Sequence, residues 1–393
     1  MSEERYRVPM SSADLDQSDY DAVLEVLHTG RLALGPKSEE FERRIAEYVG
    51  VEHAVTVNSG TSALHLIVRG LGLRKGDEVL VPSFTFAASV NALLYEGVTP
   101  IFVDIEPDTY NLDPADIEAK ITTSTRAIMA VDVFGHPAAW DRIELEASRR
   151  GLFVIDDSCE GLGAEFRGKK LGAFGDAAAF AFYPNKQITM GEGGVIVTND
   201  DKLAAYARSA RNQGRGGGSW LEHVRLGYNY RLDEMSAALG CSQLARIEEI
   251  LARRAQVAAR YDARLGRVAG IRLPVVRSDV RMSWFVYVVT LDWGIDPEKV
   301  MAGMEKRGIP VRVYFVPIHE QVYTRDLGIM PGLLPVTDSI SGRTIALPFH
   351  TNLSPEEVEL VASALEASIS EAADKGGGSP VPGAPPRTIG GRR

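Results

Sequence analysis

Short, nearly continuous apolar runs recur through the first half of the chain. They lie at residues 54–57, 78–82, 100–104, 127–134, 152–157, 178–183 and 194–198. Helical periodicity fills several of the gaps between them, for example at 61–70 and 86–95. Runs without polar alternation are typical of strands covered on both faces, and their alternation with helices is typical of a parallel sheet. We therefore predict an α/β fold built on a large, mainly parallel sheet.

The second half of the chain has a different pattern. One apolar stripe predicts a single long helix, because its members recur at helical spacing: Leu244, Ile247, Leu251, Ala258, Tyr261 and Leu265. After it we expect strands at 284–291 and 311–316 and a helix at 297–307. A closing helix is predicted over 354–373, where Ser354 and Glu357 form a capping-box pattern.

These patterns divide the chain into three parts. A large domain at 1–245 includes an N-terminal arm, and a smaller α+β domain occupies 246–373. The last segment, 374–393, is rich in Gly, Pro and Arg and has no apolar periodicity. We expect that segment to be disordered.

Composition and charge exclude several classes of protein. The 393 residues are 45% hydrophobic and 24% charged, which is ordinary for a globular protein, and the formal net charge of −10 argues against a nucleic-acid binder. No apolar run approaches a membrane span, and the N-terminus lacks an apolar signal core. Cys159 and Cys241 are too few for a disulfide framework or a structural metal site. We expect a cytoplasmic protein without a metal or a membrane partner.

The strongest candidate for chemistry is one lysine between a strand and a glycine-rich bend. Lys186 follows the turn residues Pro184 and Asn185 and precedes Gly191-Glu192-Gly193-Gly194. Apolar and glycine-rich chain around an amine excludes water, which favours the neutral form that attacks a carbonyl to give a Schiff base. On composition alone, a single lysine of this kind is more often a solvated loop lysine.

Two further segments offer an acid and an anion site. Asp156 and Asp157 end a predicted strand at the sheet edge where α/β proteins bind ligands, and one of them could hold a protonated pyridine nitrogen. Acids at strand ends also cap helices. The segment 58–61, Asn-Ser-Gly-Thr, opens a helix whose free N–H groups and dipole suit a phosphate, although an ordinary capped helix has the same pattern. The pattern matches neither a P-loop nor a dinucleotide fingerprint.

Taken together and in order, these segments resemble the sugar aminotransferases of the DegT/DnrJ/EryC1/StrS family, which belong to the fold-type I enzymes that use pyridoxal 5′-phosphate (PLP). The resemblance runs from about Gly30 to about Ala373. Its other motifs are GPKSEEFE at 35–42, VPSFTF at 81–86, RNQGR at 211–215, GYNYR at 227–231 and PIH at 317–319. It implies a fold-type I architecture, with PLP in the large domain and a homodimer whose active sites are shared.

The resemblance also implies roles for single residues. Lys186 forms the Schiff base with the cofactor and then moves a proton between the substrate carbon and the cofactor. Asp157 pairs with the pyridinium nitrogen and keeps the ring an electron sink. Phe86 stacks on the ring, and the helix start holds the phosphate through Ser59, Gly60 and Thr61.

Three further positions concern the cofactor. The resemblance implies that Asn229 reaches the phosphate from the partner subunit. Glu160 stands where many relatives have glutamine near the cofactor hydroxyl, and Ala181 stands where many have a phosphate-binding serine. The substrate cleft is bordered by family-like segments that contain Arg31, His223, Arg231, Arg312, Tyr314 and His319. Their cations would suit a diphosphate-bearing sugar, although arginines near dimer interfaces are often structural.

The function that follows is transfer of the amino group of L-glutamate to a keto-sugar, one linked to a nucleotide. A keto-cyclitol of the kind used in aminoglycoside assembly is the alternative acceptor. Sugar dehydratases of the family carry histidine at the lysine position, so Lys186 argues against dehydration. A non-catalytic PLP-binding regulator is disfavoured by the intact Lys186 and Asp157 and by the lack of a DNA-binding segment.

Overall fold

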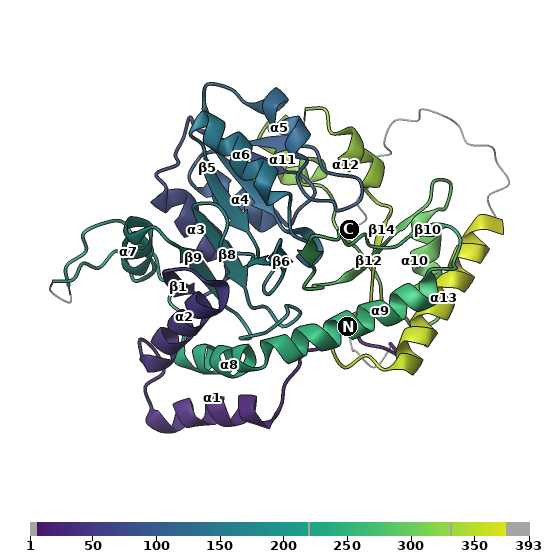
Figure 1. Cartoon of the computed structure of the whole chain (residues 1–393), viewed down its shortest axis with the longest axis horizontal. Helices are drawn as coiled ribbons and strands as arrows, with labels where there is room; N and C mark the ends of the chain where they lie inside the picture. The colour runs from purple at the N-terminus through teal and green to yellow at the C-terminus, as the bar shows by residue number, and fades with distance from the viewer. Residues whose placement is uncertain (1–5, 219–220, 331, 375–393) are drawn as a thin grey trace.

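The computed structural model describes residues 6–218, 221–330 and 332–374 of the chain (Figure 1). Its largest sheet contains seven strands in the order β1-β9-β8-β5-β4-β2-β3. These are β1 His53–Val57, β2 Glu78–Pro82, β3 Thr99–Val103, β4 Thr125–Val131, β5 Phe153–Asp157, β8 Ala177–Ala181 and β9 Gly194–Thr198. The strands from β8 to β3 run parallel, whereas β9 is antiparallel to both β8 and β1. The predicted α/β fold with a mainly parallel sheet is therefore confirmed.

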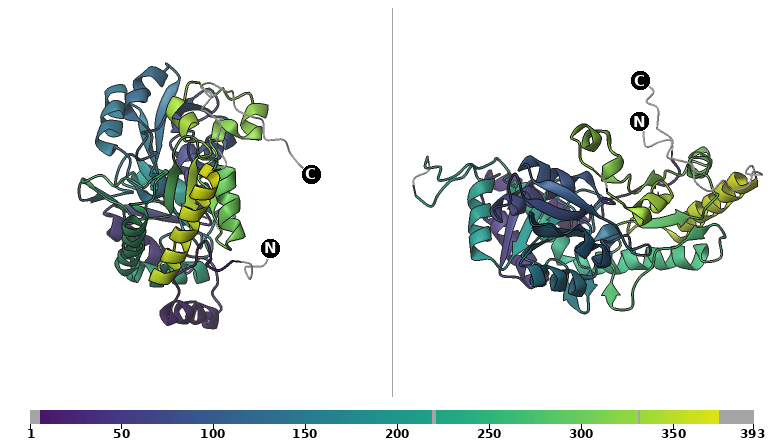
Figure 2. Two further views of the ribbon diagram at one scale, coloured as in Figure 1. Left: turned by 90° about the vertical axis from the view of Figure 1, so that its right-hand side faces the viewer. Right: turned by 90° about the horizontal axis from the view of Figure 1, so that it is seen from above.

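Helices cover both faces of this sheet, which is why its strands are apolar on both sides (Figure 2). Along β2, Val79 and Val81 pack on one face, and Leu80 packs on the other. The first face is covered by α3 Gly60–Gly70, α4 Ala87–Tyr95 and α7 Asp201–Arg211. The second is covered by α2 Pro36–Val49, α5 Pro114–Lys120, α6 Trp140–Arg150 and α8 Glu234–Ala245. The N-terminal helix α1, Gln17–Thr29, packs on α8.

Some strands are shorter than their apolar runs predict. The strand predicted at 127–134 is wrong at its end, because the chain leaves β4 after Val131 and forms a 3₁₀ turn (η2) at Val133–Gly135. The run at 284–291 forms a strand, β12, only over Tyr287–Leu291. The backbone N–H groups of Ser283 and Phe285 instead donate to the carbonyls of Gly135 and Phe134. Apolar residues in both segments are buried in loops that meet each other, and periodicity alone does not separate such loops from strands.

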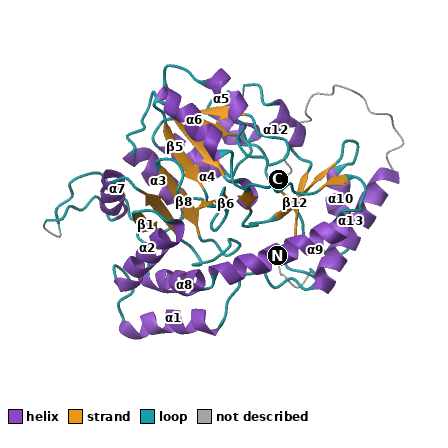
Figure 3. Cartoon of the chain, in the orientation of Figure 1, coloured by secondary structure: helices purple, strands orange, loops and turns teal. Residues whose placement is uncertain are grey.

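A second sheet has four antiparallel strands in the order β10-β12-β14-β13. Its other strands are β10 Ile271–Arg272, β13 Arg312–Val313 and β14 Thr344–Leu347, so the predicted strand at 311–316 is shortened to two residues. A three-stranded sheet contains β6 Glu165–Phe166, β7 Lys169–Lys170 and β11 Val280–Arg281. Helices α10 Pro297–Lys306 and α13 Pro355–Asp374 pack together beside the four-stranded sheet (Figure 3). The short helix α12 Pro335–Ile340 packs Ile340 into the core of that sheet, whereas α11 Val322–Asp326 places Tyr323 against the core of the large sheet.

The long helix predicted from the stripe at 244–265 is present, but it is interrupted near its start. Helix α9 spans Ile247–Leu265, and Leu244 belongs to α8, which ends at Ala245. All stripe residues are buried: Ile247 and Leu251 in the core around α2 and α8, Ala258, Tyr261 and Leu265 in the core of the small sheet. The helix thus joins the two cores.

The closing helix begins as predicted. The Ser354 N–H donates to the Glu357 carboxylate at 2.8 Å, and the Glu357 N–H donates to the Ser354 hydroxyl at 3.1 Å, so the capping box is confirmed. The predicted disorder at 374–393 concerns residues outside those described, apart from Asp374, which ends α13. No helix in the described ranges is both long and apolar enough to cross a membrane.

Candidate active site

A cavity of about 510 Å³ opens at the carboxyl ends of the parallel strands. Its walls come from the segments that follow β1, β2, β5 and β8, and it is closed on the other side by Phe285 and residues 313–316. This is the edge where open α/β sheets place their ligands. Eight residues predicted from the sequence line it: Ser59, Gly60, Thr61, Phe86, Asp157, Glu160, Lys186 and Tyr314.

Lys186 reaches the cavity from a turn that follows β8. The N–H of Lys186 donates to the Tyr183 carbonyl at 2.9 Å, and the N–H of Phe182 donates to the Gly193 carbonyl at 3.0 Å, which pins both ends of the loop. The side chain is only 13% exposed. Its Nζ lies 3.6 Å from Glu160 Oε1 and 3.9 Å from the centre of the Phe285 ring.

Asp157 ends β5 and turns its carboxylate into the same cavity. Its Oδ2 accepts a hydrogen bond from the Ser89 hydroxyl at 2.6 Å, and its Oδ1 accepts one from the Cys159 N–H at 3.3 Å. Asp157 is buried, yet none of the ion pairs within the described residues involves it. A buried carboxylate without a cation is costly, so this position suits the cationic part of a ligand.

The start of α3 forms a backbone cradle. Ser59 is the N-cap and accepts a hydrogen bond from the Ser62 N–H at 3.1 Å. At Gly60 an added Cβ would lie 2.7 Å from Ala181 Cβ and 2.8 Å from Cys159 Sγ, so no larger residue fits there. The N–H groups of a helix start and its dipole attract anions, and a glycine lets an anion approach the backbone closely. Phe86, which precedes α4, is 64% exposed on the cavity wall and offers a free aromatic face.

Glu160 is a buried acid beside the lysine. Its Oε2 accepts a hydrogen bond from the Phe134 N–H at 3.0 Å. Burial raises the pKa of Glu160, whereas Lys186 and the Phe134 N–H oppose that rise. The cavity therefore contains a lysine and three acids: Asp157 and Glu160 are buried, and Glu192 is exposed.

Comparison with known sequences identifies the family of the chain. Residues 13–366 match the profile of the DegT/DnrJ/EryC1/StrS aminotransferase family. The chain belongs to this family. A GDP-perosamine synthase of Caulobacter vibrioides is 38% identical over 371 residues, which cover 92% of this chain and 98% of that protein. A dTDP-3-amino-3,4,6-trideoxy-alpha-D-glucose transaminase of Streptomyces venezuelae is 37% identical over 86% of this chain and 89% of that protein.

Solved structures agree with the assignment to this aminotransferase family. DesV of S. venezuelae, solved with a ketimine intermediate, has a TM-score of 0.84 at 36% identity and covers 89% of this chain and 93% of its own. The putative sugar aminotransferase Spr1654 of Streptococcus pneumoniae, solved in a PLP form, has a TM-score of 0.88 at 28% identity and covers 93% of this chain and 100% of its own. The resemblance predicted from the motifs, the fold-type I architecture and the aminotransferase class are confirmed.

Three residues expected to bind cofactor or substrate in this family member lie outside the cavity of their own chain. Asn229, His223 and Arg231 are absent from the cavity lining. Asn229 and Arg231 flank Tyr230, which packs against the core of the large sheet and accepts a hydrogen bond from the Asn58 N–H at 3.0 Å through its carbonyl. Asn229 is exposed and forms an isolated bridge with Asn212. Arg231 donates to the Asn212 side chain at 3.1 Å, and His223 Nδ1 lies 2.9 Å from the Gln213 carbonyl oxygen.

The other three expected substrate residues also make contacts away from the cavity. Arg31 donates to the Leu34 carbonyl, and Arg312 donates to the Val311 carbonyl at 3.1 Å. His319 Nδ1 lies 2.7 Å from the Ser83 hydroxyl, and its Nε2 lies 3.2 Å from Asp338 Oδ1. Only Tyr314 of the six predicted substrate contacts reaches the cavity within one chain.

Sequence reasoning missed several residues that shape the site. Ser89 was detectable, because it lies three positions after Phe86 and therefore on the same side of the predicted helix. Thr85 lines the cavity and lies 2.8 Å from the Ser89 hydroxyl. Phe285 has no local signal, since it comes from a segment about a hundred residues after the lysine and meets it only in the folded chain.

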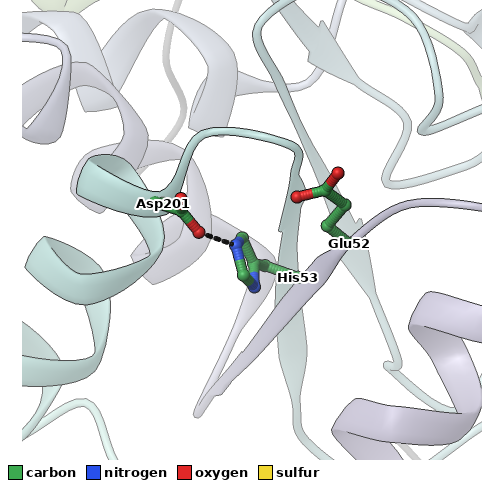
Figure 4. Close-up of side chains that lie close together, drawn as sticks. All are labelled: Glu52, His53 and Asp201. Atoms are coloured by element: carbon green, nitrogen blue, oxygen red, sulfur yellow. Dashed lines mark hydrogen bonds and ion pairs between the residues drawn. The ribbon is translucent and has the colours of Figure 1, made fainter.

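Two groups of potential metal ligands lie elsewhere. Glu52, His53 and Asp201 come together at the start of β1 (Figure 4). His53 Nε2 lies 2.7 Å from Asp201 Oδ1, and this pair fastens β1 to the first turn of α7. The second group is His319, Glu320 and Asp338. The two acids in each group are exposed, as is common in surface contacts without a metal.

Proposed function

We propose that this family member binds PLP in the cavity and transfers the amino group of L-glutamate to a nucleotide-linked keto-sugar. The observation that carries the proposal is the presence of Lys186 and Asp157 in one cavity that the start of α3 also lines. A lysine, a buried acid and an anion cradle are the three features that an aldehyde, a pyridinium and a phosphate require.

The residues present fit PLP part by part. Asp157 forms no ion pair within the described residues and would pair with the ring nitrogen, while Ser89 holds its carboxylate in place. Gly60 lets the helix start pack directly on Ala181 and Cys159 and would offer its backbone N–H to the phosphate, while the exposed Phe86 would stack on the ring. Ala181 brings no hydroxyl to this wall, so the phosphate would depend on backbone N–H groups and on the neighbouring hydroxyls of Ser59 and Thr61.

When bound, PLP supplies an electron sink for removal of the proton next to the substrate nitrogen. The chain's own residues then hold and move that proton. Lys186 accepts the proton at Nζ and returns it. Its amine is the base that reaches into the cavity, and it lies at the end of a flexible side chain. Asp157 would pair with the protonated ring nitrogen, and Phe285 and Phe315 line the cavity with apolar side chains that exclude water.

The proposal includes a homodimer in which each site draws residues from both chains. Asn229, His223 and Arg231 do not line the cavity of their own chain. Val224 and Leu226, which follow His223 closely in the chain, are 53% and 67% exposed. Exposed apolar side chains suit contact with a second protein surface. Asn229 would then reach the cofactor phosphate of the partner.

The nucleotide-linked acceptor is supported by the relatives and by charge. The two sequence relatives described above are a GDP-perosamine synthase and a dTDP-sugar transaminase. Arg31 and Arg231 carry permanent positive charges in segments outside the cavity, where a partner chain could bring them to a diphosphate. Glutamate is proposed as the donor on the family resemblance.

Two measurements test the proposal. The purified chain is incubated with PLP, reduced with borohydride and digested, and we expect the pyridoxyl group on the peptide that contains Lys186. Lys186→Ala should lose it, because Lys169 and Lys170 belong to β7 and do not line the cavity. Labelling at another lysine in the unmodified chain would refute the site.

The second measurement follows ¹⁵N from labelled glutamate into GDP-, dTDP- and UDP-linked keto-sugars and into keto-cyclitols. We expect labelled amino-sugar nucleotide. Transfer to a keto-cyclitol alone would replace the acceptor class, and no transfer from glutamate with transfer from another amino acid would replace the donor.

A further inference from the structure

The amine of Lys186 lies between two side chains that attract a cation in different ways. Glu160 Oε1 is 3.6 Å from Nζ, and the centre of the Phe285 ring is 3.9 Å from Nζ. A carboxylate and an aromatic face both stabilise an ammonium group, and they do so more strongly where water is excluded. Glu160, Phe285 and most of Lys186 are buried.

Both partners are held rigidly. Glu160 is fixed through its side chain by the Phe134 N–H and through its carbonyl by the Gln187 amide at 2.5 Å. Gln187 directly follows the lysine, so the lysine loop is tied to the turn that carries the acid. Phe285 is fixed by Arg254, which donates to its carbonyl at 2.8 Å. The segments that contain Phe134, Glu160 and Phe285 therefore meet beside the amine of Lys186.

The carboxylate and the aromatic face stabilise Lys186 only while its amine carries a charge. In the proposed function the amine is bonded to the cofactor for one part of turnover and is free for the rest, when it takes up a proton. A buried ammonium without a partner is costly and would turn away from the reacting atoms. We propose that Glu160 and Phe285 form a receiving site that holds the protonated amine of Lys186 while it is not bonded to the cofactor. Both are then positioning residues, and the inference rests on the proposed function.

The other titratable groups that face Glu160 do not replace it. Asp157, three residues before Glu160 in the segment that follows β5, is a like charge, and burial raises the pKa of Tyr314 to about 12, so that this phenol is neutral near pH 7. Burial raises the pKa of Glu160, and the ammonium of Lys186 opposes the rise. Within the described residues, the Glu160 carboxylate is the group that pairs with this amine.

The test measures the charge of the amine directly. The full-length chain without cofactor is labelled with acetic anhydride, which acylates neutral amines, over a series of pH values, and labelling of the Lys186 peptide is measured by mass spectrometry. Glu160→Gln removes the charge and keeps the shape of the side chain. We expect the pH of half-maximal labelling to fall by about one unit, which means about tenfold faster labelling below the midpoint. Phe285→Leu should shift it in the same direction by a smaller amount.

Two controls accompany these variants. Glu192→Gln makes the same substitution in the same cavity, at an acid that forms no ion pair with Lys186 in the described part of the chain, and should leave the midpoint unmoved. Lys169, at the edge of the three-stranded sheet, is the reference peptide in every sample and should label alike in all variants.

Borohydride fixation of PLP in the same proteins separates the two proposals. If PLP is fixed on Lys186 but neither Glu160→Gln nor Phe285→Leu moves the midpoint, the receiving site is wrong and the proposed function stands. If no PLP is fixed on Lys186 in the unmodified chain, the proposed function fails and the receiving site fails with it. A shift in Glu160→Gln together with normal fixation supports both.

Discussion

The hydroxyl of Ser89 donates a 2.6 Å hydrogen bond to the carboxylate of Asp157. The two residues are 68 positions apart in the chain, on the first turn of α4 and at the end of β5. Ser89 is fully buried and also lies 2.8 Å from the Thr85 hydroxyl. A short bond from a buried hydroxyl orients the carboxylate that is proposed to face the cofactor nitrogen.

Ser89→Ala should weaken PLP binding and slow amino transfer. Loss of one hydrogen bond to a charged group costs about 1.5–3 kcal/mol, which corresponds to tenfold or more in the dissociation constant. The measurement is cofactor titration by absorbance, with circular dichroism to verify folding. Thr85→Val removes a hydroxyl that contacts Ser89 and not the acid itself, so it should have a clearly smaller effect. Equal effects of the two substitutions would show that Ser89 does not act through Asp157.

Asp157→Asn should preserve the fold and cripple catalysis. An amide does not stabilise a protonated pyridine nitrogen, so the ring loses its capacity to accept electrons. We expect the half-reaction with glutamate to slow by about a hundredfold or more, as is typical when stabilisation of a developing charge is removed. Stopped-flow absorbance measures this rate. Asp156 is the control, because its side chain lies on the other side of β5 and accepts a hydrogen bond from the Gly172 N–H. An unchanged rate in Asp157→Asn would contradict the assignment.

The buried acids Asp132 and Asp156 should make the stability of the fold depend on pH. Both are fully buried, and Asp132 accepts hydrogen bonds from Trp140 and Ser158, whereas one oxygen of Asp156 has no donor among the described residues. Burial raises the pKa of Asp132 to about 6, and burial and the adjacent Asp132 raise the pKa of Asp156 well above its usual value. The folded chain therefore keeps a proton that the unfolded chain releases near pH 4.

The sign of the effect follows from proton counting. Above about pH 4 the folded state binds more protons than the unfolded state, so the free energy of unfolding falls as pH rises, by at most about 1.4 kcal/mol per unit for each proton. The fall should extend through about pH 6, where Asp132 titrates, and further for Asp156. Asp156→Asn supplies a neutral partner to Asp132 at every pH and should flatten this fall between about pH 4 and 8. Melting temperatures across that range measure the fall in stability. Parallel curves for the two proteins would show that Asp156 does not keep the proton in the folded chain.

Subunit mixing tests the shared active site. Lys186→Ala and Asn229→Glu should each be inactive, but a mixed dimer has one site with an intact lysine and an intact asparagine. Equal mixing makes half of the dimers mixed, so unfolding and refolding the two variants together should restore about a quarter of normal activity. Native mass spectrometry verifies exchange of subunits. No recovery with confirmed exchange would place Lys186 and Asn229 in the same site of one chain.

The sequence determined the sheet and the position of the lysine. All seven apolar runs of the first half are strands of the large sheet, because strands covered on both faces have no polar alternation. The capping box at Ser354 and Glu357 also formed as its local pattern predicted. Motif order was sufficient for the family, and the motifs that carry Gly60, Phe86, Asp157 and Lys186 lie at strand ends where the sheet places ligands. Strand ends were less certain, as at 131–135, because apolar residues in buried loops resemble strand residues.

Only the tertiary structure decided which side chains meet the lysine and the acid. Ser89, Glu160 and Phe285 reach the site from three separate segments, and their contacts depend on how the turn after β5 and the loop before β12 pack together. The same packing placed Asn229 and Arg231 outside their own cavity, although their motif is as clear as that of Lys186. Local patterns encode backbone conformation and burial, whereas a contact between distant segments depends on the packing of the whole core.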